Sequence, residues 1–159
     1  MVVLVIGGDS MIGSALSEHW SYDKDVQCYS STRHKKLVSD SRPYLDLKKP
    51  RSFKMYIHYD VVILCASKSS IADCDLYKKQ TRIINVDNTY AISKRLSQLN
   101  AHIIFLSSNQ VFDGTVPFKK NSDNKNPISE YGKQKADAEE LINSLKSSSI
   151  LRLTKVVYS

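Results

Sequence analysis

The stretch VLVIGGDSMIGSAL, residues 3–16, decides the fold. It starts with an apolar run typical of a strand covered on both faces, and it continues through glycines into a sequence that favours a helix. Glycines allow a sharp turn between strand and helix and a close approach to a pyrophosphate, whose charge is stabilised at the helix N-terminus. The residues of this turn that we expect to contact a dinucleotide are Gly7, Ser10, Met11, Ile12 and Gly13.

Strands and helices alternate along the rest of the chain. We expect strands at residues 2–6, 25–30, 43–47, 60–66, 102–107 and 149–157. We expect helices at residues 11–22, 51–58, 75–99 and 129–147. This order predicts an α/β fold, a doubly wound parallel sheet of the Rossmann type in three layers, with residues 1–159 as one domain.

One long segment, residues 108–128, interrupts this alternation. It is rich in Asn, Asp, Pro and Gly, and it follows a central strand directly. Long loops inside compact domains are usually functional, and open parallel sheets bind ligands beyond the carboxyl ends of their strands. We therefore expect this segment to border a ligand site.

The composition fits one globular domain, with 159 residues of which 42% are hydrophobic and 25% are charged. The apolar run at the N-terminus is too short to span a membrane and lacks the features of a signal peptide, so we expect a cytoplasmic protein without a membrane partner. The three cysteines have no CxxC spacing and the four histidines have no ligand-like spacing, so we expect neither a disulfide framework nor a metal site.

The formal net charge is +7, which suits anionic partners. The chain has no recognised nucleic-acid-binding motif, so an interaction with nucleic acid would depend on charge alone and we do not expect one. The simpler interpretation of most of these lysines is a solvated basic surface.

The segment CYSSTRHKK, residues 28–36, bears on the choice of dinucleotide. It has no acid of the kind that binds the ribose hydroxyls of NAD(H), and it offers Thr32 and Arg33 instead. A guanidinium and hydroxyls suit a ribose 2′-phosphate, so the sequence favours NADP(H) over NAD(H), unless Arg33 is only a solvated loop residue. Asp46 and Leu47 follow the third expected strand and would flank the adenine.

Tyr131 and Lys135 share one face of the helix expected at residues 129–147. An ammonium beside a phenol favours the phenolate, so Lys135 would lower the pKa of Tyr131 from its usual value of about 10. An isolated pair of this kind is more often a packed tyrosine and a solvated lysine. Here Ser108 lies at the end of the preceding strand and could act together with the pair. Ser107 is the other candidate for this place, but side chains alternate along a strand, so Ser107 should point in the opposite direction.

The glycine turn, the segment FLSSNQVFDG at residues 105–114 and the YxxxK pair together resemble the extended short-chain dehydrogenase/reductase family. The segments SSIADCD (69–75), INVDNT (84–89) and LRLTKVVYS (151–159) most resemble its dTDP-4-dehydrorhamnose reductase branch. The resemblance covers the whole chain in the correct order.

This resemblance implies NADPH-dependent reduction of a keto group on a nucleotide-sugar. Ser108 would hold the substrate oxygen, Tyr131 would protonate it, and Lys135 would tune Tyr131 and bind the nicotinamide ribose. Asn85 matches a family asparagine that supports the lysine. The further residues that we expect at the cofactor are Cys65, Ala66 and Ser67.

Three features qualify this expectation. Ser10 stands where the family motif GxxGxxG has its middle glycine, and Asn109 and Gln110 are not the acids that a dehydratase would need. Family members also continue past the last strand into a substrate-binding region, which we expect to be absent here, so that the chain would bind dinucleotide better than it selects a sugar. The alternatives are a nucleotide-sugar epimerase and a non-catalytic NADP-binding regulatory subunit. The resemblance also implies a homodimer through the two long helices.

Overall fold

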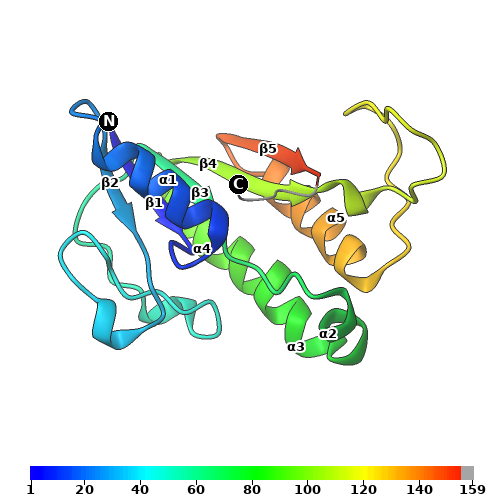
Figure 1. Ribbon diagram of the computed structural model, residues 1–159, viewed down its shortest axis with the longest axis horizontal. Coiled ribbons are helices and arrows are strands. Elements are labelled where there is room, and N and C mark those ends of the chain that lie inside the picture. Colours follow the sequence, from blue (N-terminus) through cyan, green and yellow to red (C-terminus); the bar gives the residue numbers. More distant parts are fainter. Residues whose placement is uncertain (155–159) are drawn as a thin grey trace.

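The computed structural model describes residues 1–154 of the chain. In this part five parallel strands form one sheet in the order β2-β1-β3-β4-β5 (Figure 1). They are β1 (Val2–Ile6), β2 (Gln27–Ser30), β3 (Val61–Leu64), β4 (His102–Ser108) and β5 (Ser148–Leu153). Because β2 lies on one side of β1 and β3 on the other, the chain reverses its direction of progress across the sheet at β1. The prediction of a doubly wound parallel sheet is therefore confirmed.

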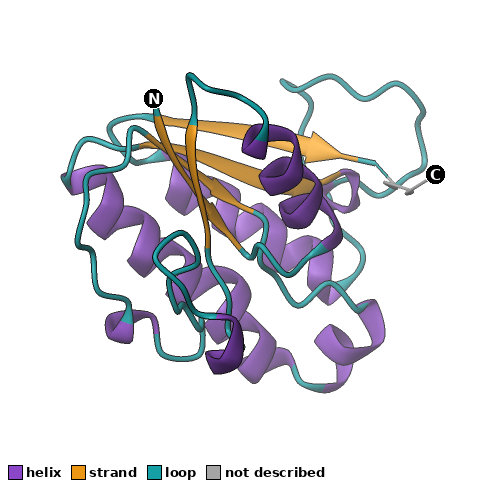
Figure 2. Ribbon diagram, turned by 60° about the vertical axis from the view of Figure 1, so that its left-hand side comes forward, coloured by secondary structure: helices purple, strands orange, loops and turns teal. Residues whose placement is uncertain are grey.

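Helices cover both faces of the sheet (Figure 2). The α-helices are α1 (Met11–Ser21), α2 (Ile71–Leu76), α3 (Lys78–Arg82), α4 (Thr89–Gln98) and α5 (Glu130–Asn143), and η3 (Ile83–Asn88) is a π-helix. Three short 3₁₀ turns complete the described part, η1 (Lys35–Leu37), η2 (Pro50–Ser52) and η4 (Asn109–Val111). No helix within residues 1–154 is both long enough and apolar enough to cross a membrane.

The core consists of two apolar clusters, one on each face of the sheet. Along β1, Val3 and Val5 belong to one cluster and Leu4 and Ile6 to the other, as the alternation of side chains along a strand requires. The helix residues in these clusters are Ile12, Leu16 and Trp20 of α1 on the first face, and Ile92, Leu96, Ala138 and Ile142 of α4 and α5 on the second. The continuous apolar run of β1 is thus buried from both sides.

The strand expected at residues 43–47 does not form. Thr32 makes a single parallel bridge with Tyr44, in which the Thr32 amide donates to the Pro43 carbonyl and the Leu45 amide donates to the Thr32 carbonyl, each at 3.0 Å. Proline lacks the N–H that a longer ladder would need. Asp46 then turns the chain, because its side chain accepts a hydrogen bond from the Lys48 amide at 2.9 Å.

The prediction of a helix at residues 51–58 is also wrong. Only Pro50–Ser52 form a short 3₁₀ turn, and the chain then extends so that Phe53 enters the core. Arg95 of α4 holds this arrangement by donating to the carbonyls of Pro50 and Phe53, at 3.2 and 3.4 Å. Burial of one large side chain overrides the local preference of this segment for a helix.

The single helix expected at residues 75–99 is interrupted twice. Tyr77, with φ −119° and ψ 48°, separates α2 from α3, and residues 83–88 form the π-helix η3. π-helical turns are rare and occur frequently at functional sites. This one contains Asn85, whose buried side chain bonds to groups outside the helix.

The last two expected elements form with shifted bounds. The helix expected at 129–147 begins at Glu130, with Ser129 as N-cap, and ends at Asn143. The strand expected at 149–157 begins at Ser148, and its last expected residues, 155–157, lie outside the described part.

Candidate functional site

A cavity of about 290 Å³ opens at the carboxyl ends of β1 and β3. These strands flank the point at which the strand order reverses, which is where open parallel sheets bind ligands. The predicted cofactor residues that line the cavity are Gly7, Ser10, Arg33, Asp46, Leu47, Cys65, Ala66 and Ser67. The cavity therefore brings together residues from the glycine turn, from the loop after β2 and from the end of β3.

The turn after β1 leaves no room for side chains at its glycines. Gly7 has φ +94°, and a Cβ there would lie 2.6 Å from the Ala66 amide nitrogen. A Cβ at Gly13 would overlap the Gly7 carbonyl, so α1 packs directly on the turn. These close approaches fit the turn of a dinucleotide site.

Ser10 differs from its expected role. Its hydroxyl donates to the Gly7 carbonyl at 2.7 Å and accepts from the Gly13 amide at 3.1 Å, so that Ser10 caps α1. Its own amide also donates to the Gly7 carbonyl. Neither proton of Ser10 is therefore free for a phosphate. Within the described residues, the amides of Met11 and Ile12 have no hydrogen-bond acceptor, and they remain to meet an anion at the helix N-terminus.

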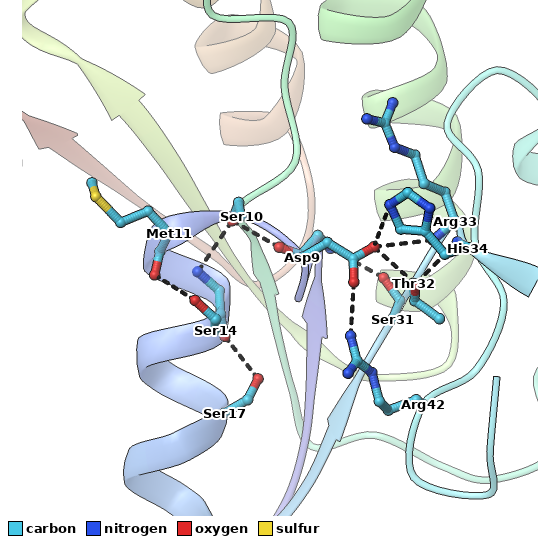
Figure 3. A network of polar contacts seen from close by, with 12 residues as sticks. Asp9, Ser10, Met11, Ser14, Ser17, Ser31, Thr32, Arg33, His34 and Arg42 are labelled. Atoms are coloured by element: carbon cyan, nitrogen blue, oxygen red, sulfur yellow. Dashed lines mark hydrogen bonds and ion pairs between the residues drawn. The ribbon is translucent and has the colours of Figure 1, made fainter. Parts of the chain in front are cut away.

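Asp9 is a residue of this site that the sequence reasoning missed. It lines the cavity, and its carboxylate binds Thr32 and Arg42 (Figure 3). Thr32 is buried and does not line the cavity, whereas Arg33 is exposed and does. The sequence does show an acid inside the glycine turn, but the argument about the dinucleotide considered acids only after β2.

Lys135 is buried on α5, where its ammonium donates to the Leu106 carbonyl of β4 at 2.8 Å and lies 4.4 Å from the centroid of the Phe105 ring. Burial lowers the pKa of Lys135 to about 8. The ammonium is also 5.8 Å from the centroid of the Tyr131 ring, so the two side chains lie on one face of α5 as the spacing predicted.

The pKa of Tyr131 shifts in the direction opposite to that expected. Burial raises it above 10, and the nearby Ser67 hydroxyl opposes this rise only in part. The Lys135 ammonium, which donates to the Leu106 carbonyl, does not outweigh this effect of burial. Since Ser67 also lines the cavity, it connects the cavity to Tyr131.

Ser108 ends β4 and caps the 3₁₀ turn η4, where its hydroxyl accepts from the Gln110 amide at 3.2 Å. It is half-buried, whereas Ser107 is buried. A Cβ at Gly132 would overlap the Gln110 carbonyl, so the first turn of α5 lies directly against η4. The fold thus places the segment after Ser108 beside the start of the helix that carries Tyr131.

Asn85 does not line the cavity and acts through its neighbours. Its side chain pairs with Lys68, accepting from the amide at 2.7 Å and donating to the carbonyl at 2.9 Å, and it also donates to the Gln134 side chain at 2.9 Å. Gln134 is fully buried, immediately precedes Lys135 and was not predicted. This network connects the segment after β3 to the helix that carries the YxxxK pair.

The predicted residues Met11, Ile12, Gly13, Thr32 and Asn85 do not line the cavity. The others fall into two groups. One lines the cavity, and the other, Ser108, Tyr131 and Lys135, lies beyond it at the end of β4 and along α5. Within residues 1–154, no three His, Cys, Asp or Glu side chains are arranged to hold a metal ion.

Solved structures with this arrangement are numerous. A dTDP-4-dehydrorhamnose reductase from Bacillus anthracis, solved in complex with NADP, superposes with a TM-score of 0.77 at 20% identity, covering 96% of this chain and 53% of that one. A UDP-galactose 4-epimerase superposes with a TM-score of 0.79 at 23% identity, covering 96% of this chain and 55% of that one. At these identities the likeness shows a shared fold.

Similarity in sequence extends to curated proteins. The chain is 24% identical to methionine adenosyltransferase 2 subunit beta of Bos taurus over 140 residues, which are 88% of this chain and 42% of the relative. It is 30% identical to dTDP-4-dehydrorhamnose reductase of Aggregatibacter actinomycetemcomitans over 96 residues, which are 60% of this chain and 33% of the relative. The chain spans less than half the length of these relatives. The family model described as RmlD substrate binding domain matches residues 1–159, and the protein therefore belongs to that family.

Proposed function

We propose that this chain is the dinucleotide-binding and catalytic part of an NADP(H)-dependent reductase that acts on a keto group of a nucleotide-sugar. The observation that carries the proposal is the position of Tyr131, beside Ser67 of the cavity and on the same helical face as Lys135. A proton donor at the edge of a dinucleotide-type cavity is what carbonyl reduction requires. Family membership supports the same chemistry.

A nicotinamide dinucleotide, when bound, supplies the hydride. The amides of Met11 and Ile12 receive its pyrophosphate, and Arg33 at the cavity wall favours the phosphorylated form. Ser108 donates a hydrogen bond to the substrate carbonyl oxygen, and Tyr131 transfers its hydroxyl proton to that oxygen.

In the proposed reduction Tyr131 acts as the proton donor. Burial raises the pKa of this phenol, so at neutral pH it carries its proton and is ready to donate it. Lys135, with a pKa of about 8, is mostly charged at neutral pH and stabilises the phenolate that forms once the proton has left.

The test is oxidation of NADPH by a 4-keto nucleotide-sugar, measured with the longest form of the protein that contains this chain. Wild-type protein oxidises NADPH, and Tyr131→Phe lowers the rate by about 100-fold or more while NADPH still binds. Tyr56→Phe, which changes an exposed tyrosine on a distant loop, is the matched control. Full turnover by Tyr131→Phe would refute the proposal.

A second candidate is a non-catalytic NADP-binding subunit that modulates a partner enzyme. It is favoured by the match to proteins named methionine adenosyltransferase 2 subunit beta, which covers 88% of this chain. NADPH binding without turnover of any 4-keto nucleotide-sugar would select this candidate. An epimerase, which would use the same Tyr131 and Lys135, would instead convert a nucleotide-sugar without net consumption of NADPH. The homodimer through the helices expected at residues 75–99 and 129–147 stays a prediction.

A further inference from the structure

Asp9 connects the glycine turn to the loop that follows β2 (Figure 3). Its Oδ1 accepts a hydrogen bond from Arg42 Nη2 at 2.7 Å. Its Oδ2 accepts from Thr32 Oγ1 at 2.8 Å and from the Arg33 amide at 3.3 Å. Thr32 Oγ1 in turn accepts from the His34 amide at 3.0 Å. One carboxylate therefore fixes the backbone at residues 32–34 and the side chain of Arg42.

These contacts use most of the hydrogen-bonding capacity of Asp9. A carboxylate offers roughly four lone-pair sites, and the chain itself occupies three of them. Asp9 is thus an acid at the wall of the cavity, but it is committed to the protein and not to a ribose hydroxyl, and it lies in the glycine turn and not after β2, where an NAD(H)-specific site has its acid. Its presence does not by itself indicate NAD(H).

The two guanidinium groups near Asp9 differ in whether their charge can act on an anion in the cavity. Arg42 is neutralised by Asp9 at 2.7 Å, and the two side chains are 37% and 24% exposed. Arg33 lines the same cavity and forms no ion pair within the described residues. Arg33 is therefore the guanidinium of this network whose charge can act on an anionic group in the cavity.

We propose that Asp9 is a positioning residue for the choice of dinucleotide. Through Thr32 and the Arg33 amide it holds the segment that presents Arg33 to the 2′-phosphate, and through Arg42 it keeps a second guanidinium out of that role. The inference depends on the proposed function, because it takes the cavity as the dinucleotide site.

The substitution Asp9→Asn separates this role from simple charge repulsion, since the two explanations predict opposite changes in the affinity for NADPH. A carboxylate that only repelled the 2′-phosphate would, once neutralised, bind NADPH more tightly. A positioning role predicts weaker binding of NADPH. The asparagine amide would direct an N–H toward one of the groups that now donate to the Asp9 carboxylate, and the loss of that hydrogen bond would loosen the segment at Arg33. We expect the Kd for NADPH to rise about tenfold, as for the loss of one hydrogen bond to a charged group, with little change for NADH.

Titration of nicotinamide fluorescence with NADPH and with NADH measures both constants. Asp40→Asn is the matched control, because it removes one carboxylate charge from the exposed loop that Asp9 contacts, and the Asp40 side chain makes no hydrogen bond within the described residues. Thr32→Val removes the bond from the other side and should shift the NADPH constant in the same direction. Hydrogen exchange of the amides of residues 31–36 gives a readout without nucleotide, and it should be faster in both variants and not in Asp40→Asn.

The outcomes are distinct. If wild-type protein binds neither nucleotide, the proposed function fails and this inference fails with it. If wild-type protein prefers NADPH, and Asp9→Asn binds NADPH as tightly as before or more tightly, the inference alone is overturned. Equal weakening of NADPH and NADH would show a purely structural role and would also overturn it.

Discussion

Replacement of Glu139 by glutamine tests how the long loop after β4 is held in place. The Glu139 carboxylate is only 2% exposed, although it sits on the same helix as Lys135. Arg152 of β5 binds it in bidentate fashion, from Nε to Oε1 at 2.9 Å and from Nη2 to Oε2 at 2.8 Å. The loop is tied to this pair, because Arg152 also donates to the Asn121 carbonyl at 3.2 Å and Lys125 lies 3.6 Å from the carboxylate.

The magnitude follows from this burial. Removing one partner of a buried ion pair typically costs about 3–5 kcal/mol, because the other charge is left without compensation. Glutamine keeps one acceptor but directs an N–H at the guanidinium. Arg152 is 17% exposed and can turn part of its charge toward water, so we expect the lower end, about 3 kcal/mol. For a domain of this size that corresponds to a fall in Tm of about 6–12 °C.

Urea unfolding followed by the fluorescence of Trp20, the single tryptophan, measures this difference. Glu140→Gln is the matched control, since Glu140 is 71% exposed and pairs only with Lys125 within the described residues, so it should cost about 0.5 kcal/mol or less. A Glu139→Gln protein within about 1 kcal/mol of wild type would refute the reasoning, because a buried bidentate pair cannot be removed so cheaply.

The same variant has a defined dependence on pH. Burial raises the pKa of Glu139, but the bonds and charge of Arg152 outweigh it and hold the pKa below the usual value of 4.5. A carboxyl group with a depressed folded pKa contributes stability above its unfolded pKa and loses it as the pH falls through the folded value. The gap between wild type and Glu139→Gln should therefore be constant from pH 7 to about 5 and narrow below about 4.5. A gap that widened in acid would contradict the assigned cause.

Two further changes test the second group of site residues. Lys135→Met should abolish turnover and yet raise the free energy of unfolding at pH 7 by about 1–2 kcal/mol. A buried ammonium whose pKa falls from 10.5 to about 8 destabilises the folded protein by about 3 kcal/mol, and the loss of the hydrogen bond to Leu106 offsets part of the gain from removing it. The gain should shrink as the pH rises from about 8 to 10.5, since the wild-type protein then regains stability as Lys135 loses its charge, and urea unfolding at several pH values measures it. Gly132→Ala should cost about 2 kcal/mol in urea unfolding, because its methyl group overlaps the Gln110 carbonyl, and a variant as stable as wild type would show that α5 does not rest on η4.

The sequence was sufficient for elements whose pattern is local. The apolar runs of β1 and β4 have one periodicity along their whole length, and the glycines at 7 and 13 are required by contacts within the same turn. Residues 51–58 were misassigned because Phe53 is drawn into the core by partners distant in sequence. No window along the chain contains that information.

The same distinction separates the site residues that were predicted from those that were missed. Ser108, Tyr131 and Lys135 were predicted from their spacing along the chain and from the resemblance to the short-chain dehydrogenase/reductase family. Asp9 and Gln134 were missed because their roles depend on side chains that approach only in the folded chain, Arg42 in one case and Asn85 in the other. Acids in glycine turns and uncharged amides on helices have many ordinary uses, so neither residue is informative alone.

Tyr131 shows where spacing stops being informative. A separation of four residues fixes that Lys135 shares its helical face, but it does not fix how deeply the phenol is buried or which acceptor takes the ammonium. In this fold the Lys135 ammonium donates to the Leu106 carbonyl, and burial is the largest effect on the pKa of Tyr131 and raises it. The pKa of Tyr131 therefore lies above its ordinary value, whereas the spacing alone predicted a lower one.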